Sequence, residues 1–198
     1  MASSKRASSS TVVRSGLVLG IVLVSALAGC GQPAARQAGH AVAQPTAAAV
    51  TTHVPATLLI PEIGMAATVE RVGLDSQGNM AVPTEPEHVG WYEPGPAPGA
   101  PGDAVIDGHL NWYTGRAAFE NLQKLRQGAE IDVIARDGTT LRFVVTDSRT
   151  VAYTDHPAGL FATTGSPRLS LITCGGAWDK SKGTYLERLV VNAVPLSR

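Results

Sequence analysis

Three side chains in this sequence have the chemistry needed to move an acyl group. Cys174 and His109 each close a short apolar run, and Arg188 lies within another. A thiolate attacks a carbonyl carbon, an imidazole takes up and returns the proton, and a guanidinium can stabilise the oxyanion that forms. Each residue alone has an ordinary structural explanation, so the prediction depends on the three being brought together by the fold.

The cysteine content of the chain supports a working thiol. There are only two cysteines, and Cys30 lies in an N-terminal segment where we expect it to be consumed by modification. Cys174 then has no partner in the mature chain, and an unpaired thiol in an oxidising compartment is a liability unless it is used. Residue type alone favours a buried structural cysteine instead, so the sequence leaves both interpretations open.

The first 30 residues are typical of an export signal. Three basic residues precede an uncharged, mostly apolar run over residues 16–29, which is shorter than the roughly 20 residues of a membrane span. The run ends in Leu-Ala-Gly-Cys, which resembles the bacterial lipobox with Cys30 as the lipidated residue. A short uncleaved anchor is the alternative. Both predict that the rest of the chain lies at the extracytoplasmic face of the membrane, attached through its N-terminus.

The remaining chain divides into a tether and one domain. Residues 31–56 are rich in Ala, Gln, Pro and Thr and cannot bury enough surface to fold, whereas residues 57–198 suffice for one core. After residue 30 there are 13 basic and 16 acidic side chains, and no basic run that would bind nucleic acid. Phosphate-binding and dinucleotide motifs are absent, and the scattered histidines have no metal-ligand spacing, so we expect no cofactor and no metal.

The domain has the pattern of a mainly β protein. A Pro- and Gly-rich loop over residues 93–102 separates two groups of strands, and Asp137-Gly138 is a favoured hairpin turn. One short helix is predicted from Thr114 to Gly128, with Phe119, Leu122 and Leu125 on one face. The strands are expected over residues 57–60, 68–73, 79–83, 104–109, 130–136, 141–145, 168–174 and 186–194. Such short strands predict a small barrel or sandwich.

Strand periodicity separates Cys174 from the core. Leu169, Leu171 and Thr173 share one face of their strand, and Cys174 lies on the other. The Gly-Gly pair that follows is expected to end the strand there. The thiol should therefore stand at a strand-to-loop edge, with a rigid strand behind it.

Together these segments resemble the sortase signature. The order His109, Cys174, Arg188 matches, with 65 and 14 residues between them, and the motif Leu-x-x-Thr-Cys-Gly-Gly surrounds the thiol. The Ile-Pro-Glu-Ile-Gly opening at residue 60 and the Val-Gly-Trp-Tyr motif at residue 89 are similar to the actinobacterial class E and F sortases, closer to F. The lipobox departs from the transmembrane helix that usually anchors sortases.

The resemblance implies both a fold and a reaction. Sortases are closed eight-stranded β-barrels that cleave an LPxTG-like sorting signal between Thr and Gly through a thioacyl enzyme, with no cofactor. By this resemblance Cys174 is the nucleophile, His109 the acid and base, and Arg188 the oxyanion and substrate ligand. The partners implied are surface proteins with C-terminal LPxTG-like signals, and an amine acceptor in a peptidoglycan precursor or a pilin.

The resemblance also places a substrate groove. The loop over residues 151–167 would form one wall, with Ala158, Leu160 and Phe161 contacting the signal, together with Thr173 beside the nucleophile. A loop that packs its own apolar residues is the alternative explanation.

Two other function classes remain open at this point. Another exported cell-wall cysteine enzyme would also use a thiol, but the residues around Cys174 fit L,D-transpeptidases poorly, and papain-like peptidases place Cys before His. A non-catalytic lipoprotein β-barrel that only binds predicts an inert, buried Cys174. The reactivity of the thiol separates this last class from the enzymes.

Overall fold

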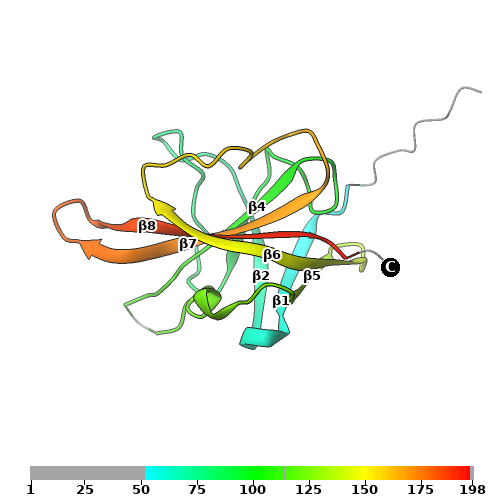
Figure 1. Cartoon of the computed structure of the whole chain (residues 1–198), viewed down its shortest axis with the longest axis horizontal. Helices are drawn as coiled ribbons and strands as arrows, with labels where there is room; N and C mark the ends of the chain where they lie inside the picture. The colour runs from blue at the N-terminus through cyan, green and yellow to red at the C-terminus, as the bar shows by residue number, and fades with distance from the viewer. Residues whose placement is uncertain (1–51, 114, 197–198) are drawn as a thin grey trace, which may run out of the picture. The chain divides into compact units, whose positions relative to one another are not determined.

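Eight β-strands form a closed barrel in the computed structural model, which describes residues 52–113 and 115–196 (Figure 1). The strands are β1 (Pro55–Ile60), β2 (Met65–Val72), β3 (Val89–Tyr92), β4 (Asp103–Gly108), β5 (Glu130–Ala135), β6 (Thr140–Ala152), β7 (Arg168–Asp179) and β8 (Thr184–Pro195). Two single-turn 3-10 helices, η1 (Pro61–Ile63) and η2 (Leu122–Lys124), complete the assigned elements of this part of the chain. The mainly β, closed eight-stranded barrel expected from the sequence is therefore confirmed.

The strand order around the barrel brings distant segments together. It runs β1-β2-β3-β4-β7-β8-β6-β5, and β5 pairs with β1 to close the barrel. The β2–β3 and β4–β7 pairs are parallel and the other pairs are antiparallel. The parallel β4–β7 pair matters most for function, because it aligns the segment ending at His109 with the segment carrying Cys174.

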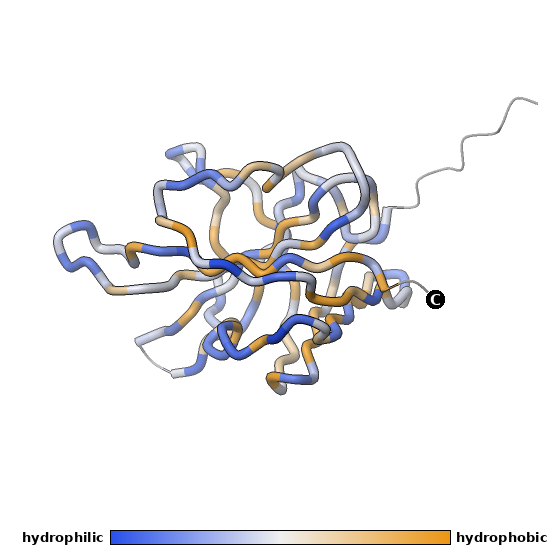
Figure 2. Tube along the Cα trace, viewed as in Figure 1, coloured by the Kyte–Doolittle hydropathy of each residue, from blue (hydrophilic) through white to orange (hydrophobic). Residues whose placement is uncertain are grey.

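Alternating side chains fill the barrel interior. In β5, for example, Ile131, Val133 and Ala135 are buried, as a period of two requires of a half-buried strand. Figure 2 shows hydrophobic residues along the strands that cross the middle of the molecule and hydrophilic residues at the β7–β8 turn. The largest fully buried side chains are Phe119, Phe143, Leu58, Ile60, Ile106, Leu122, Ile131, Leu169, Leu171, Val89, Val105 and Val133.

A second, smaller apolar cluster lies on the opposite face of β4, β7 and β8. It consists of Val105, Ile172 and Val190, one from each strand. The partly buried side chains that pack against it are Met80, Tyr92, Val151 and Leu160. These three strands are thus covered on both faces, which explains why β4 reads as a continuous apolar run rather than an alternating one.

The prediction of a helix between Thr114 and Gly128 is wrong, although the residues assigned to its apolar face are buried. Phe119, Leu122 and Leu125 are all buried, but only the single turn η2 is helical. The amides of Ala118 and Phe119 bond to distant carbonyls, those of Pro86 at 2.8 Å and His109 at 2.9 Å, and the bonds of the amides that follow, up to Leu125, are local turn bonds. Tertiary contacts therefore replace the helical hydrogen bonds. The expected cap, Thr114, lies outside the described residues.

Several strand predictions also differ from the structure, and β6 runs seven residues past its expected end at residue 145. Residues 79–83 contribute only an isolated bridge between Leu74 and Met80, and the third strand lies at Val89–Tyr92. The Gly-Gly pair after Cys174 does not end β7, which continues to Asp179 with a register shift between Gly175 and Trp178. The long antiparallel pairing with β8 keeps both glycines within the strand. This hairpin projects from the barrel at the left of Figure 1.

The predicted signal peptide, lipidation site and most of the tether fall on residues 1–51, outside the described residues. In the part that is described, no helix has the length and hydrophobicity of a membrane span. Strand β1 begins at Pro55, two residues before the expected start of the domain.

Candidate active site

Strands β4, β7 and β8 bring together the three residues predicted to do chemistry. Cys174 lies directly opposite Arg188 in the antiparallel β7–β8 pair. In the parallel β4–β7 pair, Asp107 is aligned with Ile172, and two residues further along each strand direction stand His109 and Cys174 respectively. All three side chains belong to the face that carries the second apolar cluster, because residues at i and i+2 of a strand share a face.

The imidazole of His109 is held on two sides. Its Nε2 lies 3.1 Å from the carbonyl oxygen of Pro83, and the ring centroid lies 4.8 Å from that of Trp112. The main-chain carbonyl of His109 also accepts the 2.9 Å bond from Phe119 N. Both the ring and the backbone of the residue are thus fixed at the end of β4.

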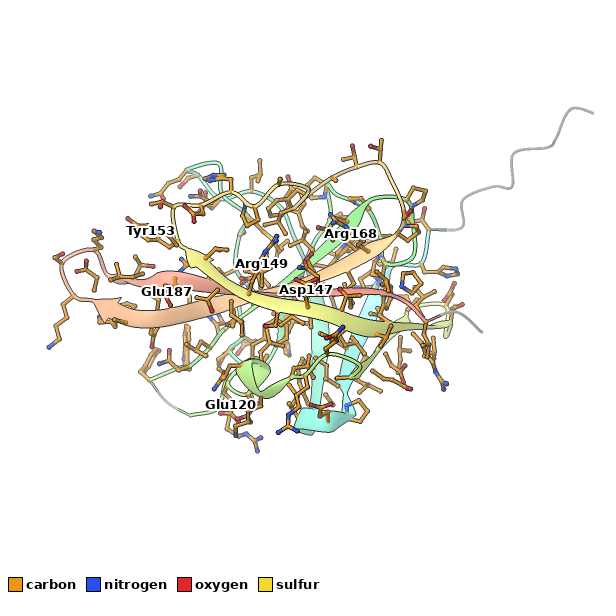
Figure 3. The ribbon with its side chains drawn as sticks, viewed as in Figure 1. Glu120, Asp147, Arg149, Tyr153, Arg168 and Glu187 are labelled. Atoms are coloured by element: carbon orange, nitrogen blue, oxygen red, sulfur yellow. The ribbon has the colours of Figure 1, made fainter. Side chains whose placement is uncertain are left out.

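The guanidinium of Arg188 is anchored by its own hairpin. Its Nη1 donates to the carbonyls of Tyr185 at 3.1 Å and Glu187 at 2.9 Å. The ring of Tyr153 lies 6.0 Å from its Cζ atom, and Figure 3 shows Tyr153 at the end of β6 near Glu187 of β8. Its Nη2 also donates to the hydroxyl of Thr184 at 3.4 Å, so a ligand over Cys174 would compete with these hairpin bonds for the guanidinium.

Thr173 faces the barrel interior rather than the site. It is fully buried, and its hydroxyl donates a 2.7 Å hydrogen bond to the carbonyl of Gly108. Since it occupies the opposite face from Cys174, its side chain does not line the surface on which a substrate would lie, contrary to the substrate-binding role expected from the sequence. Its observed role is to tie β7 to β4 next to both His109 and Cys174.

The surroundings of Cys174 favour the neutral thiol. Burial raises the pKa of the thiol, the positive charge of Arg188 lowers it, and the negative charge of Asp107 raises it further. The net direction is upward. A nucleophile in this setting needs a proton acceptor at the moment of attack, because little thiolate exists beforehand at neutral pH.

Asp107 is a functional candidate that sequence reasoning missed. It is half-buried on the same face as Cys174, and burial, only partly offset by Arg188, raises the pKa of its carboxyl to about 7. The signal in the sequence was its place two residues before His109, which puts both side chains on one face of β4. Perturbed carboxyl groups of this kind gather at functional sites.

Replacing Asp107 with asparagine is expected to speed alkylation of Cys174 by roughly two- to tenfold at pH 8–9. Above its pKa of about 7 the wild-type carboxylate is charged and raises the thiol pKa, and the variant lacks that charge. Below this pH the carboxyl is mostly neutral and the two rates should converge. The measurement is the rate of iodoacetamide modification against pH. The exposed Asp155→Asn variant is the control, and equal rates at pH 9 would contradict the coupling.

The predicted groove wall lies over the second apolar cluster. Leu160 packs against that cluster, and the Phe161 ring meets the Tyr92 ring edge-on at a centroid distance of 5.2 Å. Phe161 is the one described non-glycine residue with a positive φ, 64°, a conformation that costs energy for an aromatic residue. Ala158 is exposed on the same loop. Side chains of this loop and of Tyr92 therefore cover the apolar floor beside Cys174.

A polar ladder closes the other end of the same face. The Ser170 hydroxyl donates to Asp103 at 2.9 Å, Asn192 Nδ2 donates to Asp147 at 2.6 Å, and Arg168 lies 3.4 Å from Asp103. Figure 3 shows Arg168 and Asp147 near this part of β6 and β7. These side chains satisfy one another, so the ladder is a boundary of the surface rather than a free binding group.

The described residues contain no cluster of three or more His, Cys, Asp or Glu side chains placed to hold a metal ion. The site therefore consists of a thiol, an imidazole and a guanidinium, with one carboxyl beside them.

Comparison with known proteins identifies the family of this fold. Residues 58–196 match the family model described as the sortase domain. The fold resembles sortase C-1 from Actinomyces oris (26% identity, 72% of this chain and 73% of that one, TM-score 0.57). It also resembles sortase A from Corynebacterium diphtheriae (23% identity, 75% and 63%, TM-score 0.56) and sortase C1 from Streptococcus agalactiae (21% identity, 72% and 67%, TM-score 0.56). No curated protein matches the chain. The family match spans most of the sequence and all of the barrel except the first three residues of β1, and the chain belongs to the sortase family.

Proposed function

We propose that the chain is a cell-surface cysteine transpeptidase of the actinobacterial class E and F type, closer to F. It cleaves an LPxTG-like sorting signal between Thr and Gly and transfers the new Thr carboxyl group to an amine. The observation that carries the proposal is the pairing of Cys174 with Arg188 in β7 and β8, next to the parallel β4–β7 pair at whose end His109 lies.

The first half of the reaction forms a thioester. The Cys174 sulfur attacks the threonyl carbonyl while the thiol proton passes to His109, and the oxyanion that develops is stabilised by Arg188. The C–N bond then breaks, and the leaving glycyl amine takes the proton from the imidazolium. The raised pKa of Cys174 supports a concerted transfer of this kind, because the resting thiol keeps its proton.

The second half returns the enzyme to its starting state. An incoming amine attacks the thioester carbonyl and gives its proton to His109, and an amide bond replaces the C–S bond. The proton on His109 then returns to the Cys174 sulfur. We propose that the acceptor amine belongs to a peptidoglycan precursor or a pilin. Water competes with the amine for the thioester, so transfer needs an amine that is held near the site at high local concentration.

The location of the enzyme follows from its first 30 residues. We propose that Cys30 is lipidated, or that the apolar run before it stays as a signal anchor, so that the barrel acts at the extracytoplasmic face of the membrane. We propose that the Ala-, Gln-, Pro- and Thr-rich segment before β1 tethers the barrel to the membrane. An export compartment also accounts for a chain with one mature thiol.

The sorting signal must displace part of the groove wall. Leu160 packs on the apolar floor of Val105, Ile172 and Val190, and Phe161 closes against Tyr92. We propose that the Leu and Pro side chains of the signal take the place of Leu160 on this floor. Opening is helped by the unfavourable backbone conformation of Phe161.

The test is cleavage of a quenched LPxTG-like peptide library by residues 52–198 with an added amine, beside a Cys174→Ala control. Cleavage between Thr and Gly with transfer to the amine, absent in the control, supports transpeptidation and identifies the motif. No cleavage with a thiol that alkylates readily would mean another substrate class. No cleavage with an inert thiol would favour a non-catalytic barrel.

A further inference from the structure

The segment over residues 83–88 supplies the group that orients the His109 ring. The carbonyl oxygen of Pro83 lies 3.1 Å from Nε2 of His109. A carbonyl oxygen can only accept a hydrogen bond, so Nε2 must carry the hydrogen. In the neutral ring the lone pair is then on Nδ1. The imidazolium keeps the same bond, so the proton gained and lost during the reaction is the one on Nδ1.

Glu70 of β2 holds this segment in place. Its Oε2 accepts a 3.0 Å bond from Thr84 N, and its Oε1 accepts bonds from Glu85 N at 3.4 Å and from His88 Nδ1 at 2.7 Å. The Thr84 amide belongs to the peptide group whose carbonyl is that of Pro83. The carboxylate therefore binds one end of the very peptide group that binds His109 at its other end.

A second set of bonds ties the same segment to the backbone of His109. Ala118 N donates to the carbonyl of Pro86 at 2.8 Å, and the next amide, Phe119 N, donates to the carbonyl of His109 at 2.9 Å. Two consecutive residues, Ala118 and Phe119, thus link the backbone of the 83–88 segment to the backbone of His109. The backbone of His109 is therefore fixed, and its ring is oriented by the Pro83 carbonyl and by the Trp112 ring.

The charge of Glu70 is suited to this task. Burial raises the pKa of its carboxyl, but the bonds from Thr84, His88 and Glu85 outweigh burial, and the net direction is downward. The side chain is therefore an anion throughout the neutral range. An ionised acceptor makes hydrogen bonds about twice as strong as a neutral one, which favours a fixed peptide group.

We propose that Glu70 is a positioning residue that acts through the Pro83 carbonyl to hold His109 in the tautomer with hydrogen on Nε2, leaving Nδ1 to transfer protons. This inference rests on the proposed function for its role in catalysis. The tautomer and its dependence on Glu70 are properties of the resting protein.

The test compares Glu70→Ala, Glu70→Gln and a Glu87→Gln control in the full-length protein. Glu87 belongs to the same segment and is exposed, and no side-chain hydrogen bond of its carboxylate is found among the described residues. Side-chain nitrogen NMR of labelled histidine, assigned with His109→Ala, reports which ring nitrogen carries hydrogen. Peptide transfer gives kcat and KM.

In the wild type we expect a protonated Nε2 and an unprotonated Nδ1 for neutral His109. Glu70→Ala should give a mixture of tautomers and lower kcat by about 10- to 100-fold with little change in KM. Glu70→Gln should lie between, since its amide oxygen can still accept from Thr84 N. Glu87→Gln should match the wild type in both measurements.

A wild type with hydrogen on Nδ1 would overturn the proposal. So would a folded Glu70→Ala protein that keeps the wild-type tautomer, even if its thermal stability falls. If Glu70→Ala does not fold, the Glu70→Gln spectrum decides, and a spectrum equal to that of the wild type with unchanged kcat counts against the proposal. Should no peptide be transferred while the tautomer shifts in Glu70→Ala, the positioning holds and the proposed reaction fails.

Discussion

Replacing Arg188 with glutamine is expected to lower kcat/KM for peptide transfer by roughly 10²- to 10³-fold, the usual cost of removing one oxyanion donor. Arg188 lies opposite Cys174, and its positive charge also lowers the pKa of the thiol. The variant should therefore show a second effect, slower alkylation of Cys174 at a given pH. The kinetics of peptide transfer measure the fall in kcat/KM. The rate of Cys174 alkylation against pH measures the change in the thiol pKa.

Two further variants separate charge from geometry. Arg188→Lys keeps the charge but loses the planar fork, so alkylation should stay near the wild-type rate while transfer falls. The exposed Arg136→Gln, at the β5–β6 turn, controls for loss of any arginine. Transfer by Arg188→Gln within a factor of three of the wild type would exclude an oxyanion role for this side chain.

Replacing Gly108 with alanine is expected to destabilise the barrel by about 2–3 kcal/mol and to abolish most activity. A Cβ at this position would lie 2.5 Å from Cδ2 of Phe119 and 2.9 Å from its Cγ and Cε2. The Phe119 ring is fully buried, so it can move only by displacing its neighbours in the core. The strain falls on the end of β4, so His109 and the bond from Thr173 to the Gly108 carbonyl move with it.

Thermal unfolding and peptide transfer measure this effect, with Gly73→Ala as the matched control. Gly73 is exposed, and a Cβ there would have no neighbour within 4 Å. We expect a fall of the Tm by roughly 10 °C for Gly108→Ala and little change for the control. A Gly108→Ala protein as stable and active as Gly73→Ala would show that the end of β4 relaxes more easily than its packing indicates.

Local patterns predicted the parts of the fold that depend on local physics. The period of two in residues 168–174 correctly put Leu169 and Leu171 in the core and Cys174 on the other face. Asp137-Gly138 correctly marked the β5–β6 turn, where Gly138 has a φ of 83°. The helix failed because the amides near Phe119 bond to residues distant in the chain, which a helical pattern cannot reveal.

Features that depend on pairing between strands could not be predicted. The end of β7 was misplaced because pairing with β8 extends the strand past its glycines. Asp107 gains its importance from the alignment of β4 with β7, and Glu70 from the return of the 83–88 segment to β2. The only local signal of Asp107 was its place two residues before His109, and Glu70 had no local signal of its link to the 83–88 segment.

The parallel pairing of β4 with β7 has a consequence for how the protein acquires its activity. It joins residues about 65 positions apart, with β5 and β6 between them in the chain. Closing so long a loop costs conformational entropy, and contacts of this kind tend to form late and slowly during folding. His109 and Cys174 then meet only as the barrel closes. In an incompletely folded chain the thiol of Cys174 has no imidazole beside it. We therefore expect the chain to become active only when folding is complete.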